Sequence, residues 1–230
     1  YLDLGDLAAG EYWMNEAMRL APTQSSSKWA AVYLASYTGT VEDVAAAANE
    51  LLAVSPSDGL ALVRLRDADY QAGRIEDALR RYRQVVPDFV DGEDPDVNAT
   101  NWSWAIESAN VLMKVGERNR ANKLLSKALP VVKSIPRLGY AGYGISDAEI
   151  HALLGDKEAA LSALSEAVDA GWRISWRVKT EMNDNLASLH DDSRYLEIVE
   201  KIRSQMAEQL AQVRVWEANG ELTANPGSVN

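Results

Sequence analysis

Residues 39–56 read GTVEDVAAAANELLAVSP, and residues 73–87 read GRIEDALRRYRQVVP. Each segment starts with a glycine and ends with a proline, and the apolar residues between them recur at intervals of three or four. That period is typical of a helix with one buried face. A glycine before such a helix suits a tight turn, because glycine tolerates positive φ and ends the preceding helix well. The two segments therefore predict helical hairpins with a glycine at each turn.

The same pattern occurs five times along the chain. Gly5, Gly39 and Gly73 lie 34 residues apart, and Gly116 and Gly155 follow at spacings of 43 and 39 residues. The last two spacings correspond to a 34-residue unit with insertions of nine and five residues. Only 14 of the 230 residues are glycine, so this phasing indicates an internal repeat.

The second helix of each copy carries residues of graded size at fixed distances from its glycine. A small side chain at a crossing point lets two helices approach closely, and a larger one between two such points fills the remaining space. The position five residues after each glycine, which is usually small, holds Gly10, Val44, Ala78, Ala121 and Ala160. The position twelve residues after holds Ala17, Leu51, Val85, Ala128 and Ala167. The position nine residues after is usually larger and holds Met14, Tyr82, Leu125 and Leu164.

Prolines mark where these second helices end. Pro22 and Pro56 follow their glycines by 17 residues, and proline cannot continue a helix. Pro87 and Pro130 come three positions earlier in their copies. We expect them to shorten or kink the second helices of the third and fourth copies.

The glycine, alanine and proline positions in a 34-residue unit resemble the tetratricopeptide repeat family. The resemblance covers residues 1–171 as about five repeats and implies an all-α fold, a right-handed superhelical solenoid of helix-turn-helix units. Val32 and Arg66 depart from the family pattern, because they stand late in a first helix where the family prefers a small residue. Tyr1 falls where the family often has an aromatic residue inside a first helix, so we expect a first repeat truncated at its N-terminus and a natural protein that extends further.

Residues 172–218 form a predicted C-terminal capping region, and residues 219–230 a polar tail. Val199, Ile202, Met206, Leu210 and Val213 recur at helical spacing as one apolar stripe, which predicts a long helix. A solenoid needs such an element to cover its last exposed face. The run from IPRLGYAGYGISDAE to this helix resembles the C-terminal ends of bacterial signalling proteins, in which the repeats follow a winged-helix transcription regulator domain or a nucleotide cyclase domain.

Two insertions could be mistaken for ligand-binding loops. Residues 88–96 contain five acids and no base, but their spacing does not follow the alternating ligands of a calcium loop, so we expect a solvated, mobile loop. Glycines 139, 142 and 144 flank Tyr140 and Tyr143 without the lysine of a phosphate-binding loop. This second stretch predicts a structured turn before the next helix.

Composition excludes several classes of function. The formal net charge of -11 disfavours direct nucleic-acid binding, and no apolar run is long enough to span a membrane. The absence of cysteine removes disulfides and thiolate metal sites and favours a reducing compartment such as the cytoplasm, with the periplasm left open. His151 and His190 fit no metal-ligand or nucleophile pattern, so we expect no cofactor, no metal and no catalytic site in this segment.

The resemblance implies a binding groove lined by the first helices of successive repeats. Trp29, Tyr33 and Tyr37 share one helix face at spacings of four, which suits an aromatic trough for a peptide or a helix, although packing against a neighbouring repeat is the alternative. The lysine and asparagine with which some members hold a peptide carboxylate are replaced by Trp29, Tyr33 and Arg64. The predicted inner-face residues, as we call them below, are Trp29, Tyr33, Tyr37, Val63, Asp67, Tyr70, Ile106, Asn110, Met113 and Glu149.

We expect the chain to act as a protein-protein interaction or regulatory scaffold that binds a peptide or helix in this groove. The alternative is a small-molecule-sensing domain of a transcription regulator or cyclase, in which Asp67, Asn110 and the aromatic residues would hold the ligand. Neither the partner nor the oligomeric state follows from the sequence.

Overall fold

A computed structural model describes residues 1–139 and 142–222 of the chain. Tyr140 of the glycine-rich turn and residues 223–230 of the predicted tail lie outside the described residues. The described residues form helices and no strands, so the prediction of an all-α fold is confirmed. The elements are α1 (Leu7–Leu20), α2 (Ser25–Thr38), α3 (Val41–Val54), α4 (Gly59–Gln71), α5 (Ile75–Val85), α6 (Pro87–Asp91), α7 (Trp102–Lys114), α8 (Arg118–Ser134), α9 (Ser146–Leu154), α10 (Lys157–Asp169), α11 (Trp176–Glu181), the 3₁₀ helix η1 (Asp184–Leu189) and α12 (Ser193–Ala218).

Four of the five glycines, Gly39, Gly73, Gly116 and Gly155, lie between helices as the repeat pattern predicts, and Gly5 precedes α1. Gly116 separates α7 from α8 with φ +86°, and Gly155 separates α9 from α10 with φ +84°. This left-handed conformation costs an L-residue free energy and costs glycine almost none. Gly39 differs, because its φ of -98° is one that any residue can adopt, and there the chain passes from α2 to α3 in an extended conformation.

The residue after the hinge glycine often caps the second helix. Asp6 and Asp156 each accept a hydrogen bond at 3.0 Å from the backbone N–H three residues later. Thr40 and Asp43 form a capping box, in which each side chain accepts from the other's backbone N–H. These caps satisfy backbone donors that the first turn of a helix leaves unpaired. A glycine followed by a capping residue therefore both ends one helix and starts the next.

The chain divides into two compact units. The first consists of Tyr1–Leu65, Ile174–Val178 and the chain from Val199 onward, and the second of Arg66–Arg173 and Lys179–Ile198. In the first unit, α2 packs against both α1 and α3. Its described core includes Val32, Ala48, Leu51, Ala61 and Leu65.

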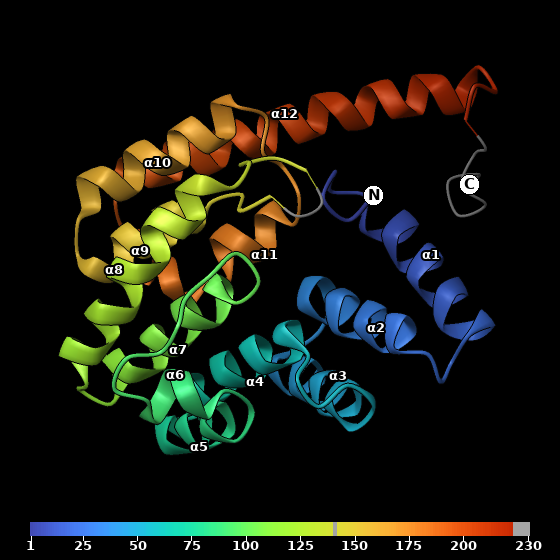
Figure 1. Cartoon of the computed structure of the whole chain (residues 1–230). Helices are drawn as coiled ribbons and strands as arrows, with labels where there is room; N and C mark the ends of the chain where they lie inside the picture. The colour runs from blue at the N-terminus through green and yellow to red at the C-terminus, as the bar shows by residue number, and fades with distance from the viewer. Residues whose placement is uncertain (140–141, 223–230) are drawn as a thin grey trace. The chain divides into compact units, whose positions relative to one another are not determined.

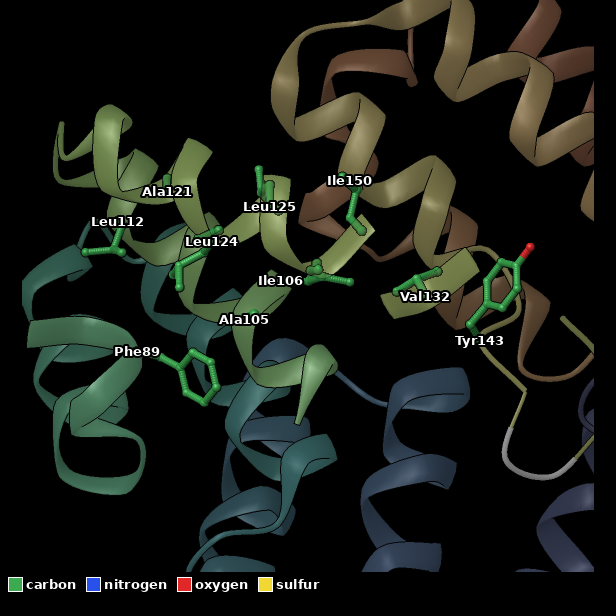
Figure 2. Close-up of a cluster of buried hydrophobic side chains, with 12 residues drawn as sticks. Phe89, Ala105, Ile106, Leu112, Ala121, Leu124, Leu125, Val132, Tyr143 and Ile150 are labelled. Atoms are coloured by element: carbon green, nitrogen blue, oxygen red, sulfur yellow. The ribbon is translucent and has the colours of Figure 1, made fainter. Parts of the chain in front are cut away.

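The second unit contains helical hairpins that pack in chain order. Helix α7 packs against α8, α8 against α9, and α9 against α10, as Figure 1 shows in green to orange. Figure 2 shows the apolar cluster to which α6, α7, α8, α9 and the segment before α9 contribute: Phe89, Ala105, Ile106, Ala109, Leu112, Ala121, Leu124, Leu125, Ala128, Val132, Tyr143 and Ile150. The alanines five and twelve residues after Gly116 and Gly155 are completely buried, which fits their predicted role at close crossings.

The prolines act in two ways. Helices α1 and α3 end two residues before Pro22 and Pro56, as predicted. Pro87 ends α5 and begins α6 at a position where its missing N–H costs no hydrogen bond. Pro130 instead lies inside α8, which continues to Ser134, so of the two predicted effects, shortening or a kink, this proline does not shorten the helix.

The acidic insertion, predicted as a solvated, mobile loop over residues 88–96, begins as α6 and then contacts α8, with the Asp94 side chain 67% exposed. Lys123 and Lys127 place their ammonium groups 2.8 and 2.7 Å from the Asp94 carboxylate. The same ammonium groups donate to the backbone carbonyls of Glu93 and Pro95. Their hydrogen bonds lower the pKa of Asp94 to about 2, so this carboxylate stays charged down to strongly acidic pH. Two residues one helical turn apart on α8 thus fix the insertion.

The C-terminal region contains the long helix that the apolar stripe predicts. Helix α12 runs for 26 residues, with Val199, Ile202 and Met206 buried. Ser193 begins it, and the Asp192 carboxylate accepts from the Arg194 N–H at 3.0 Å. None of the described helices combines the length and the apolar character needed to cross a bilayer.

Replacing Gly116 tests the hinge. We expect Gly116→Ala to lower the free energy of unfolding by about 1–2 kcal/mol, because alanine must adopt positive φ there. Gly116→Asn should lose less, because asparagine tolerates this conformation better than alanine. Urea unfolding of the three proteins measures the difference, and equal stability of the alanine variant and the wild type would contradict the assigned hinge.

Removing the two lysines tests how the acidic insertion is fixed. We expect Lys123→Ala combined with Lys127→Ala to speed cleavage of residues 92–101 by an endoproteinase that cuts before aspartate. The thermal unfolding midpoint should change little, because the contacts lie at the surface. Lys133→Ala, an exposed position on the same helix, should leave the cleavage rate unchanged. An unaltered rate in the double variant would show that the lysines do not hold the loop.

Candidate functional site

The predicted inner-face residues are distributed over both units. Trp29, Tyr33, Tyr37 and Val63 belong to the first unit. Within it, Tyr33 and Tyr37 are buried, Val63 is half-buried and Trp29 is 40% exposed. The second unit holds the half-buried residues Asp67, Tyr70 and Met113 and the buried residues Ile106, Asn110 and Glu149.

The three aromatic residues of α2 form one stack. The rings of Trp29 and Tyr33 are parallel within 13°, with centroids 4.8 Å apart, and the Tyr37 ring lies 5.3 Å from that of Tyr33. The spacing of four residues therefore places them on one face, as predicted. Arg177 lies 5.1 Å from the centroid of the Tyr37 ring and adds a cation–π contact.

Other segments of the first unit satisfy the hydroxyl groups of this stack. Tyr37 donates to the Asp3 carboxylate at 2.6 Å, and Tyr33 donates to Ser175 Oγ at 2.5 Å. Asp3 also accepts from the Ser175 N–H at 2.9 Å, and its carbonyl accepts from the Trp176 indole at 2.7 Å. Burial and the hydrogen bond to Asp3 raise the pKa of Tyr37, so its hydroxyl stays protonated. Only Trp29 of the stack keeps a large exposed surface.

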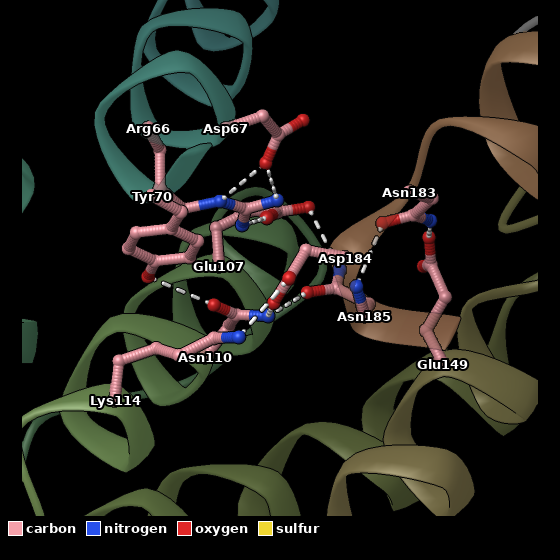
Figure 3. A network of polar contacts seen from close by, with 10 residues as sticks. All are labelled: Arg66, Asp67, Tyr70, Glu107, Asn110, Lys114, Glu149, Asn183, Asp184 and Asn185. Atoms are coloured by element: carbon pink, nitrogen blue, oxygen red, sulfur yellow. Dashed lines mark hydrogen bonds and ion pairs between the residues drawn. The ribbon is translucent and has the colours of Figure 1, made fainter. Parts of the chain in front are cut away.

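Two of the predicted inner-face residues in the second unit have packing contacts. Ile106 is part of the apolar cluster in Figure 2, and Met113 packs against that cluster from a half-buried position. The other four, Asp67, Tyr70, Asn110 and Glu149, belong to one polar network, which Figure 3 shows. They come from α4, α7 and α9, three helices that precede a hinge glycine.

Arg66 is the charged group around which this network is built. Its side chain is fully buried, whereas the side chains of Asp67 and Glu107 are 14% and 17% exposed. The guanidinium donates to Asp67 Oδ1 at 3.0 and 2.8 Å and forms an ion pair with Glu107. Arginine is almost never fully buried without such partners, because the cost of removing its charge from water must be offset.

The charges of this cluster shift one another's proton affinity. Burial disfavours the charge of Arg66, but the carboxylates of Asp67 and Glu107 more than offset this and raise the pKa of the guanidinium. Burial also raises the pKa of Glu107, the Arg66 charge opposes that rise, and the nearby Glu149 carboxylate adds to it. Arg66 therefore keeps Glu107 more acidic than its surroundings alone would allow.

Asn110 links this ion-pair cluster to the 3₁₀ helix η1. Its carbonyl oxygen accepts from the Tyr70 hydroxyl at 2.9 Å, and its amide donates to Asp184 at 3.0 Å and to Asn185 at 2.8 Å. One turn further along α7, Lys114 pairs with the other Asp184 oxygen at 3.0 Å. A buried amide with both ends hydrogen-bonded fixes the relative positions of its partners.

Two further amides extend the network towards α9. Asn183 donates to Glu149 at 2.5 Å, and Asn185 donates to Glu107 at 3.3 Å. The Asn183 side chain also accepts from the Asn185 N–H at 3.1 Å, which holds the start of η1 in its conformation. Residues 183–185 therefore contact side chains of α7 and α9 with all three of their own side chains.

Six members of the network were not among the predicted inner-face residues. One signal for Arg66 was present, because a charged residue stands at a position that the repeat reserves for a small side chain. A buried arginine at that position requires a carboxylate from a neighbouring helix. No local pattern identifies that carboxylate or the segment that completes the network. The six residues are Arg66, Glu107, Lys114, Asn183, Asp184 and Asn185.

The arrangement is suited to holding polar side chains. Its carboxylates are paired with a guanidinium, an ammonium or amides. In residues 1–139 and 142–222, no group of three or more histidine, aspartate or glutamate side chains is arranged to bind a metal ion. Outside the network, His190 has its Nε2 atom 3.1 Å from the Thr180 carbonyl and its ring against Tyr195.

Comparison of the chain with known proteins finds no matching family model, no matching curated protein and no matching solved structure. The fold and the network thus define an all-α protein with a buried polar site.

Replacing Arg66 tests whether it holds the network together. We expect Arg66→Met to lower the free energy of unfolding by about 3–5 kcal/mol at pH 7, because two partly buried carboxylates lose their cation. The loss should be smaller at pH 5. Without Arg66 the pKa of Glu107 in the folded protein rises further above its unfolded value, so stability falls as the pH rises through that interval.

Urea unfolding of wild type and variant at both pH values measures this effect. Arg83→Met is the matched control, because Arg83 pairs with Asp91 in an exposed ion pair. Its stability should stay close to that of the wild type at both pH values. An Arg66→Met deficit that is small, or that does not grow with pH, would contradict the role given to this guanidinium.

Proposed function

We propose that this chain is an interaction module of the tetratricopeptide type and forms part of a larger bacterial regulatory protein. In this proposal its hairpins stack as a right-handed solenoid, and the predicted inner-face residues bind a protein segment. The fold supports the proposal through four hinge glycines that lie between helices and through helices that pack in chain order within each unit.

The polar network is the main observation that supports this proposal. Side chains from α4, α7 and α9 converge on it, and each of these helices precedes a hinge glycine. In a stack of helical hairpins the first helices line one continuous face, so residues at equivalent positions of successive repeats should meet there. The resemblance to the tetratricopeptide family predicted Asp67, Asn110 and Glu149 on that face before their contacts were known.

The chemistry of this face favours a polypeptide ligand over a small molecule. In the second unit its polar groups contact three consecutive residues, Asn183, Asp184 and Asn185, through side-chain hydrogen bonds and an ion pair. In the first unit Trp29 offers an exposed aromatic surface next to a satisfied tyrosine pair. Aromatic anchors and paired polar groups are the common elements of protein interfaces.

The proposal assigns binding, not catalysis, to this chain. Catalytic carboxylates act on a substrate in a reachable cleft and need proton affinities set for that task. Glu107 and Asp67 are instead paired with a guanidinium that has no exposed surface. An activity of the larger protein would then depend on another segment, which this module recruits or regulates.

Site-specific photo-crosslinking tests the proposed binding face. We expect a photoreactive phenylalanine analogue at Trp29 or at Met113 to crosslink the same partner polypeptide in the source cell. Both positions retain accessible surface, so the analogue can reach a bound partner. The readout is a shifted band identified by mass spectrometry.

The control position is Arg80 on α5, a second helix, where the side chain is 63% exposed. The product formed from the inner-face positions should be absent there. Identical products from Arg80, or no products from Trp29 and Met113, would contradict the proposed face.

A further inference from the structure

The tripeptide Asn183–Asp184–Asn185 is bound through its side chains. Asn183 donates to Glu149, Asp184 accepts from Asn110 and Lys114, and Asn185 donates to Glu107. Figure 3 shows the three side chains pointing from the brown segment towards the green helices α7 and α9. Contacts to side chains are what give a groove its specificity for a peptide ligand.

The receiving side chains form an ordered pattern of charge. A carboxylate, Glu149, faces the amide of Asn183; an ammonium and an amide face the carboxylate of Asp184; and a second carboxylate, Glu107, faces the amide of Asn185. The amide donors of Asn183 and Asn185 face carboxylate acceptors, and the carboxylate of Asp184, the single negative charge of the tripeptide, pairs with the ammonium of Lys114. The site is therefore complementary to the order amide, acid, amide.

We infer that residues 183–185 act as an intramolecular ligand of the face formed by α7 and α9, and that the partner segment carries the same order of amide, acid and amide side chains. This inference rests on the proposed function and specifies its ligand. A partner would then bind by replacing the chain's own segment, so the segment lowers the apparent affinity for the partner.

The chain's own segment is held at the site in two ways. It is covalently tethered, which gives it a high effective concentration at the site. Leu186 and Leu189, which follow the tripeptide, are completely buried and hold η1 in place. A free peptide of the same sequence should therefore bind the wild type weakly and should bind well only when the internal segment is weakened.

Charge reversal of Asp184 provides such a variant. Asp184→Lys places a second ammonium opposite Lys114 and leaves every receiving side chain on α7 and α9 unchanged. The probe is a fluorescein-labelled peptide with the sequence EMNDNLASLH of residues 181–190, and fluorescence anisotropy measures its binding to the full chain. We expect an affinity at least about tenfold higher for the variant than for the wild type.

Three controls separate recognition from general loosening. Asp191→Lys makes the same charge change at an exposed position and should bind the peptide no better than the wild type. A peptide with lysine in place of its aspartate should not bind Asp184→Lys. Combining Asp184→Lys with Lys114→Glu restores an attractive pair of opposite charges and should return peptide binding to the wild-type level.

The isosteric variant Asp184→Asn keeps the experiment decisive if charge reversal prevents folding. It removes only the negative charge, so it should still bind the peptide several times more tightly than the wild type. A folded Asp184→Lys or Asp184→Asn protein with no gain in peptide affinity would overturn the inference. The crosslinking at Trp29 and Met113 does not depend on this outcome, so the proposed binding face would stand or fall separately.

Discussion

A guanidinium without exposed surface must be neutralised within the protein, and this requirement organises the second unit. Arg66 meets it with Asp67 from its own helix and Glu107 from α7. Because the ion pair with Arg66 holds the Glu107 carboxylate in place, this carboxylate can accept a hydrogen bond from the side-chain amide of Asn185. The buried ion pair is thereby connected to η1. The apolar cluster of α6 to α9 is buried, but it does not determine which polar groups meet.

In the first unit, tyrosine hydroxyl groups pose a related problem. Its stacked tyrosines need acceptors for their hydroxyl groups, and Asp3 and Ser175 provide them. Ser175 has φ +54°, a strained conformation for a residue other than glycine, and its hydrogen bonds to Asp3 and Tyr33 offset that strain. In both units, polar residues that the repeat pattern assigns to the inner face have partners from distant parts of the chain.

The helices and their hinges were predictable because their causes are local. Gly116, Pro56 and the buried alanines act within one helix or one turn, and their spacing is visible in the sequence. The position of Pro130 in the interior of α8 was not predictable in this way, because the packing of the helix overrides the local cost of an interior proline. The lysines that fix the acidic insertion lie about 30 residues from it, so composition alone suggested a free loop.

The candidate site was predictable only in part. The family resemblance predicted that Asp67, Asn110 and Glu149 line one face, but it could not show that Asn183–Asn185, more than 70 residues beyond Asn110, contact side chains of this set. Native-state amide hydrogen exchange in the wild type and in Arg66→Met tests the dependence of this contact on the buried guanidinium most directly. The account predicts strong protection of residues 183–189 in the wild type and its loss in the variant, with α10 unchanged. Equal protection of the segment in both proteins would contradict it.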